Sequence, residues 1–188
     1  AKTRAQLKDL IDHQEWGQLF LKRPVKAGDF VYVPSGTIHA LNKGIVVLET
    51  QQSSDTTYRL YDYDRVDATT GQKRALHLQQ ATDVTTVPFD EPHLTPVVEH
   101  RGSSTITTLV APPLSPYFTV YKWEVSGELS LTAQRPYTLV SVIKGQGQLT
   151  VDGDAYPLQK GDHFLLPADV TAWTLTGELT MIASTSTI

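Results

Sequence analysis

The chain contains no cysteine, so it can form neither a disulfide nor a cysteine-ligated metal site, and it has no thiol nucleophile. Basic residues are also scarce: 16 Lys and Arg against 20 Asp and Glu give a net charge of −4, which argues against nucleic acid as a partner. No apolar run approaches the roughly 18 residues that a membrane helix needs, so no membrane partner is expected. The lack of cysteine fits a reducing compartment, and we expect a cytoplasmic protein.

The remaining composition is typical of a globular protein. With 188 residues, 40% of them hydrophobic and 19% charged, the chain is long enough to bury a core. Helical spacing of apolar residues is confined to the beginning, where Leu7, Leu10 and Ile11 recur one turn apart. We expect one or two short helices within residues 1–24, interrupted at Gly17.

Beyond residue 25 the pattern changes to short β-branched and aromatic runs separated by Gly, Pro and Asp, which is typical of a β-sandwich or barrel. Strands are predicted at residues 30–33, 45–50, 105–111, 117–125, 139–143, 148–151, 163–166 and 179–184. Asp152-Gly153 predicts a tight hairpin turn, because both positions suit a positive φ. The Gly-x-Gly motif at residues 145–147 precedes a strand rather than a helix, so it predicts another hairpin turn and not a dinucleotide-binding loop.

An internal repeat indicates two related β units. The sequences AGDFVYVP at residues 27–34 and KGDHFLLP at residues 160–167 place Gly, Asp and Pro at identical offsets. In each copy, Gly-Asp predicts a turn into a strand, and Pro ends the pairing of that strand. Between the two units, residues 82–96 hold three prolines and several acids, and predict a linker.

The first copy leads into a histidine that could bind a metal. After a Ser-Gly turn, the alternation of a strand places His39 on the same face as Leu41. If that face lines a barrel, the imidazole points into its cavity. The second copy has Ala172 at the corresponding position and offers no ligand. The spacing alone leaves two interpretations open: a metal ligand, or a hydrogen-bonded and partly buried histidine.

Longer motifs extend this pattern. Gly-Asp-x4-Pro-x4-His is similar to the second half-motif of cupin barrels. The runs VPSGTIHAL at residues 33–41 and VLETQQSSDTTYRLYDYDR at residues 47–65 resemble type I mannose-6-phosphate isomerase, in the short form found in Bacillus and lactic acid bacteria. YKW at residues 121–123 and KGDHF at residues 160–164 resemble the C-terminal cupin unit of that family. The resemblance therefore covers essentially the whole chain.

The resemblance implies an all-β, jelly-roll-like cupin fold: a fragment of a double β-barrel with one or two short N-terminal helices. It implies a helical segment at residues 1–24 and the remainder of a metal-binding cupin barrel at residues 25–81. The linker at residues 82–96 then leads to a degenerate C-terminal cupin-like β-domain at residues 97–188. We expect this last domain to be structural, because its copy of the motif lacks the histidine.

The resemblance also implies a zinc-dependent isomerase that interconverts mannose 6-phosphate and fructose 6-phosphate. His39 matches one zinc ligand of the family, Arg59 matches its catalytic arginine, and Glu49 matches an acidic residue that lines the pocket. The family takes its other zinc ligands from an upstream segment, for which this sequence has no counterpart. We therefore expect the chain to correspond to the C-terminal portion of such an enzyme and to be inactive alone, with an incomplete zinc site.

The chemistry of this reaction suits these residue types. Aldose–ketose isomerisation passes through an enediolate, whose negative charge a guanidinium and a divalent cation both stabilise. A carboxylate such as Glu49 could take the carbon-bound proton, or it could serve as an ion-pair partner or support a metal ligand. The alternative for Arg59 is a surface salt bridge to Asp62 or Asp64. The alternative for the protein is a stand-alone cupin-like module that binds a sugar without turnover.

Overall fold

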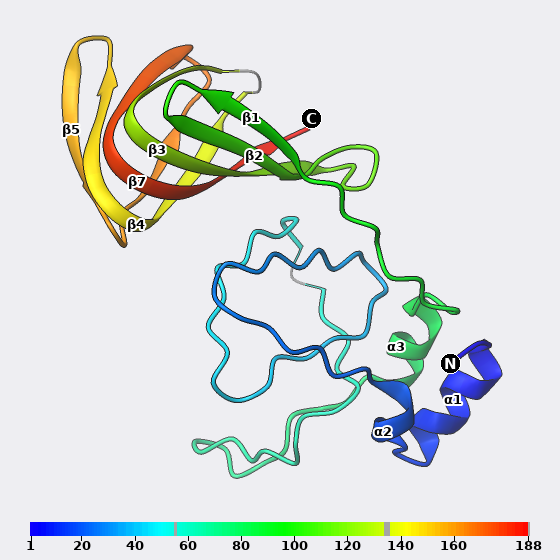
Figure 1. Cartoon of the computed structure of the whole chain (residues 1–188). Coiled ribbons are helices and arrows are strands. Elements are labelled where there is room, and N and C mark those ends of the chain that lie inside the picture. Colours follow the sequence, from blue (N-terminus) through cyan, green and yellow to red (C-terminus); the bar gives the residue numbers. More distant parts are fainter. Residues whose placement is uncertain (55, 134–135, 188) are drawn as a thin grey trace. The chain divides into compact units, whose positions relative to one another are not determined.

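The computed structural model describes residues 1–54, 56–133 and 136–187 (Figure 1). The chain divides into two compact units. Unit 1 comprises Ala1–Val47 and Ser53–Glu91, and unit 2 comprises Leu48–Gln52 and Pro92–Ile188. Over the described residues, none of the helices has both the length and the apolar character that crossing a membrane requires.

Unit 1 contains three short helices: α1 (Arg4–Asp12), α2 (Trp16–Leu19) and α3 (Leu78–Val84). The Thr3 side chain caps α1 by accepting a hydrogen bond from the Gln6 amide. The prediction of one or two short N-terminal helices is confirmed, since two form, but the predicted break at Gly17 is wrong. Gly17 lies inside α2, and the chain instead turns just before it, where Gln14 has a φ of 56°.

The helices of unit 1 pack around a small hydrophobic cluster. Leu7 and Ile11 of α1, Ala81 of α3 and the intervening Leu60 are buried together. The Arg4 guanidinium donates hydrogen bonds to the carbonyl oxygens of Thr82, Asp83 and Thr85, which end α3 without intrahelical partners. These tertiary contacts explain why α3 forms although the sequence predicted a linker from residue 82.

The strands predicted at residues 30–33 and 45–50 are absent: both segments are without regular secondary structure. A strand exists only where a neighbouring strand accepts and donates its backbone hydrogen bonds. Within the described part of the chain, the one bridge of this kind in unit 1 joins Val66 to Lys73. The two apolar runs therefore leave side chains exposed, with Val46 at 97% relative exposure.

The two copies of the internal repeat nevertheless make the same turns. Gly28 and Gly161 both have positive φ, at 94° and 98°. The carboxylates of Asp29 and Asp162 each accept a hydrogen bond from the amide three residues earlier, at 3.0 and 2.7 Å. Only the second copy then continues as a strand, because β6 (His163–Leu166) finds a partner in β4.

Unit 2 is one antiparallel sheet. Its other strands are β1 (Val97–Arg101), β2 (Ser104–Val110), β3 (Phe118–Thr132), β4 (Thr138–Val151), β5 (Asp154–Gln159) and β7 (Ala172–Ser186). The order is β1-β2-β3-β7-β4-β5. Strand β6 also pairs with β4, at residues 138–141 of β4, whereas β5 pairs with residues 146–151. The sheet is curled (Figure 1). Among the described residues its two edge strands do not pair with each other, so the sheet is open.

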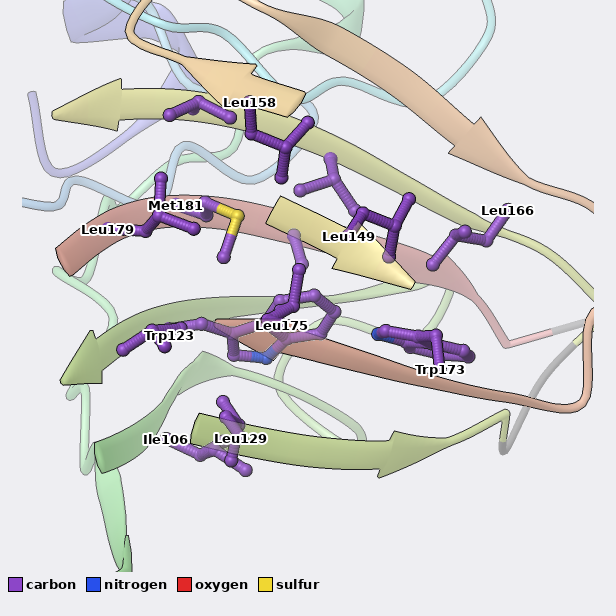
Figure 2. Close-up of a cluster of buried hydrophobic side chains, with 14 residues drawn as sticks. Ile106, Trp123, Leu129, Leu149, Leu158, Leu166, Trp173, Leu175, Leu179 and Met181 are labelled. Carbon is purple, nitrogen blue, oxygen red and sulfur yellow. The ribbon is translucent and has the colours of Figure 1, made fainter. Parts of the chain in front are cut away.

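The concave face of this sheet holds the main core. Side chains from strands β2 to β7 point toward one another there (Figure 2). Leu175 and Met181 of β7 are completely buried. The ring centroids of Trp123 of β3 and Trp173 of β7 lie 6.3 Å apart in the same core. Apolar side chains pack this face of the sheet as a closely filled protein interior.

Strand β4 corrects one turn prediction and confirms another. Asp152-Gly153 forms the predicted turn between β4 and β5, with positive φ at both residues. The motif at residues 145–147 is not a turn, because it lies inside β4, which pairs with β7 along almost the whole length of β4. A β-bulge next to Lys144 and the lack of a side chain at Gly145 let β4 bend closely over β7.

Candidate functional site

His39 is an exposed residue of unit 1 whose imidazole forms a hydrogen bond with the backbone. Its Nδ1–H donates to the carbonyl oxygen of Thr37 at 3.0 Å. This bond fixes the tautomer that leaves the lone pair on Nε2, as is usual for histidines that bind a metal. The preceding residue, Ile38, packs against the hydrophobic cluster of unit 1, which anchors the backbone beside the imidazole.

Arg59 lies beside the same cluster, because its neighbour Leu60 is one of the buried members. The Nη1 atom of Arg59 donates to the Ala75 carbonyl oxygen at 3.1 Å. The backbone of Arg59 forms two further bonds with His77, whose amide donates to the Arg59 carbonyl and whose Nδ1 accepts from the Arg59 amide. His39 and Arg59 are thus both anchored at the hydrophobic cluster of unit 1, His39 through Ile38 and Arg59 through Leu60.

The alternative interpretation of Arg59, an ion pair with Asp62 or Asp64, does not match the structure. Within the described residues, Asp62 binds Arg65 and Arg74, and Asp64 binds Lys73 at 2.6 Å. Both carboxylates therefore have other cationic partners, and the Arg59 guanidinium bonds to a backbone carbonyl.

Asp62 is the buried acid of this loop, with a side chain that is only 7% exposed. Hydrogen bonds from the Arg74 guanidinium, and then from Arg65, hold the pKa of Asp62 well below its usual range, against the opposing effect of burial. The Asp62 carboxylate thus accepts hydrogen bonds from two arginines, which ties residues 62–65 to residue 74.

This arrangement makes the stability of unit 1 depend on pH. Because the folded pKa of Asp62 is lowered, its contribution is present above the ordinary pKa of 3.8 and declines as the pH falls below that value. We expect Asp62→Asn to destabilise unit 1 at pH 7, and the difference from wild type to narrow in acid. Urea unfolding followed by the helical circular dichroism signal, which the described helices of unit 1 supply, measures this. A difference that is constant down to pH 2 would contradict it.

Glu49 belongs to unit 2, whereas His39 and Arg59 belong to unit 1. The segment of unit 2 that contains Glu49 is Leu48–Gln52. There it borders a groove of about 250 Å³ on the face of the sheet opposite the core; the lining residues are Leu48, Glu49, Thr50, Gln51, Leu139, Ser141, Ile182 and Ser184. The Glu49 side chain is exposed. The strand alternation used to assign it a face does not apply, because residues 45–50 form no strand.

The described residues do not make up a complete metal site. Among them, no three His, Asp or Glu side chains lie close enough together to hold an ion. His39 offers one ligand, whereas zinc sites take three or four protein ligands.

Sequence reasoning missed His77 as a partner of Arg59. The two residues are 18 positions apart and join two segments without regular structure. No periodicity or motif connects them, so only the fold brings them together.

Comparison with known proteins agrees with the motif analysis. The family model described as mannose-6-phosphate isomerase, cupin domain, matches residues 105–186. The mannose-6-phosphate isomerase of Streptococcus mutans is 50% identical over 99% of this chain, and ManA of Bacillus subtilis is 46% identical over 98%. The chain spans 57% of the length of each.

A solved structure gives the same result. The crystal structure of mannose 6-phosphate isomerase from Bacillus subtilis superposes with a TM-score of 0.89 at 44% identity, covering 98% of this chain and 57% of that one. The all-β cupin fold with few short helices is thereby confirmed, as is the resemblance inferred from the motifs. The chain is a relative of the mannose-6-phosphate isomerases over nearly its whole length, and it corresponds to a portion of such a protein that includes the family's cupin domain.

Proposed function

We propose that the protein containing this chain interconverts mannose 6-phosphate and fructose 6-phosphate. The observation that supports this most strongly is identity of 44–50% to proteins named as mannose-6-phosphate isomerases, maintained over 94–99% of the chain. The likeness includes unit 1, in which the amide, the carbonyl oxygen and Nη1 of Arg59 all form hydrogen bonds. The substrate is accordingly a sugar phosphate.

In this proposal Arg59 stabilises the enediolate. Its guanidinium has five N–H donors, of which the Ala75 carbonyl engages one on Nη1. The remaining donors can hold two oxygens of the sugar at once, and the permanent charge opposes the negative charge that develops on them. Glu49, whose side chain is exposed, would line the pocket, where a carboxylate can take the proton from the carbon next to the carbonyl.

His39 would supply one ligand to a zinc ion through Nε2. The bond from Nδ1–H to the Thr37 carbonyl holds the ring in the orientation and tautomer that this role requires. When bound, zinc polarises the oxygens of the sugar. Because this chain offers a single such ligand among its described residues, we propose that the 188 residues alone neither hold zinc nor turn over substrate.

The test of this proposal uses the natural full-length protein and its His39→Ala variant, both loaded with zinc and dialysed. We expect the wild type to retain close to one zinc per chain and to convert mannose 6-phosphate. The variant should lose most of its zinc, measured by elemental analysis, because one of few ligands is removed.

The same substitution at His13, an exposed histidine directly after α1 that also bonds to a backbone carbonyl, is the control and should leave the zinc content unchanged. Sugar binding without any turnover in the wild type would favour the binding-module alternative, and full zinc content in His39→Ala would refute the ligand assignment.

A further inference from the structure

Arg59 is held by a clamp that the segment of residues 75–77 provides. The Arg59 amide donates to His77 Nδ1 at 3.1 Å, the His77 amide donates to the Arg59 carbonyl at 2.8 Å, and Nη1 of Arg59 donates to the Ala75 carbonyl. Both backbone polar groups of Arg59 and one end of its side chain are therefore engaged by two residues, Ala75 and His77. Residues 56–61 form no helix or strand, so the regular backbone hydrogen bonds of such an element do not hold Arg59. The bonds to Ala75 and His77 hold it instead.

The imidazole of His77 takes part in this clamp instead of capping a helix. His77 is the N-cap residue of α3, yet its side chain makes no capping hydrogen bond. At such a position a polar side chain ordinarily accepts from the first amides of the helix. Here Nδ1 accepts from Arg59, and the ring packs edge-on against Tyr58, with centroids 6.2 Å apart.

The base of the clamp is rigid. Helix α3 starts immediately after His77, and the Ala81 amide donates to the His77 carbonyl at 2.9 Å. Ala81 is buried in the cluster that also contains Leu60, the residue after Arg59. The backbone of His77 is thus tied to the core through α3, and its imidazole is tied to Arg59.

We propose that His77 is a positioning residue for Arg59: by accepting the Arg59 amide hydrogen bond, it fixes the direction in which the guanidinium leaves the backbone. The inference rests on the proposed role of Arg59 in the isomerase reaction. A catalytic group displaced by about 1 Å can lose up to about a hundredfold in rate. Loss of one of three holding bonds should cost less, about tenfold in kcat, with KM within about twofold of wild type.

The test compares His77→Phe with His77→Asn in the natural full-length protein. Phenylalanine keeps a ring against Tyr58 but has no acceptor, whereas the asparagine Oδ1 lies one bond from Cγ, as Nδ1 does. We expect His77→Phe to lower kcat about tenfold and His77→Asn to restore at least half of wild-type turnover. His13→Phe, the same change at an exposed histidine whose imidazole lies beside Asp9, should have no effect.

A second measurement tests the bond itself. In the wild type, the Arg59 amide should exchange its hydrogen with solvent at least about fivefold more slowly than in His77→Phe, because its acceptor is lost in that variant. This measurement by NMR needs no turnover and also shows whether the variant is folded.

The proposal fails if His77→Phe retains wild-type kcat, or if the phenylalanine and asparagine variants are equally impaired. If Arg59→Ala itself retains wild-type turnover, the proposed function of Arg59 fails instead, and the two failures are thereby distinguished.

Discussion

Replacing Arg59 by alanine should lower the turnover of mannose 6-phosphate by about a hundred- to a thousandfold in the natural full-length protein. The guanidinium supplies a fixed positive charge and paired donors for oxygens that become negative only as the enediolate forms. Such an interaction is stronger in the transition state than with the bound substrate, so the loss should appear in kcat more than in KM.

The effect should not come from unfolding. The Arg59 side chain is partly exposed, and its guanidinium bonds to the backbone carbonyl of Ala75. The bonds between the Arg59 backbone and His77 do not involve that side chain, so the alanine variant can keep them. Circular dichroism and the thermal midpoint should therefore stay close to those of wild type.

Arg23→Ala is the control, since its exposed ion pair with Glu91 should contribute little to stability. Arg59→Lys should recover part of the rate, because it keeps the charge but not the two-pronged donor geometry. Equal turnover in Arg59→Ala and Arg23→Ala would remove Arg59 from the mechanism.

The turns of this protein could be predicted from sequence more securely than its strands. The turns at Gly28-Asp29 and Gly161-Asp162 form with the same hydrogen bonds. Each turn needs only a glycine that can adopt a positive φ and a carboxylate that accepts from the amide three residues earlier, and both lie within the same few residues of the sequence. Whether a strand follows depends on a partner elsewhere. Residues 163–166 pair with β4, whereas residues 30–33 do not pair within the described chain.

The same distinction applies to the candidate site. His39 and Arg59 belong to contiguous motifs, so pattern alone could single them out. The face assigned to Glu49 depended on a strand that is absent, and the contact between His77 and Arg59 depends on α3, which forms through burial of Ala81 and capping by Arg4. Local chemistry could be predicted, and long-range packing could not.

Substituting alanine for Gly145 should destabilise unit 2 far more than the same change at Gly153. Both glycines have positive φ, 86° and 91°, so both alanines carry the cost of the left-handed region, about 1–2 kcal/mol. The surroundings differ. A Cβ at Gly145 would lie 1.9 Å from the backbone oxygen of Glu178 in β7, whereas a Cβ at Gly153 meets nothing within 4 Å.

Relief of the contact at Gly145 requires β4 and β7 to separate, because the obstructing atom belongs to the backbone of a paired strand and cannot rotate away. Strand β7 lies between β3 and β4 in the sheet and carries Leu175 and Met181 of the core. We expect a total loss of about 4 kcal/mol for Gly145→Ala, the sum of the strain and an overpacking term of up to about 3 kcal/mol, against about 1 kcal/mol for Gly153→Ala. Guanidinium unfolding followed by fluorescence of Trp123 and Trp173, with Trp16 replaced by phenylalanine in every variant, measures the difference in unit 2. Equal losses at the two positions would mean that β4 does not approach β7 as closely as the bend at Gly145 indicates.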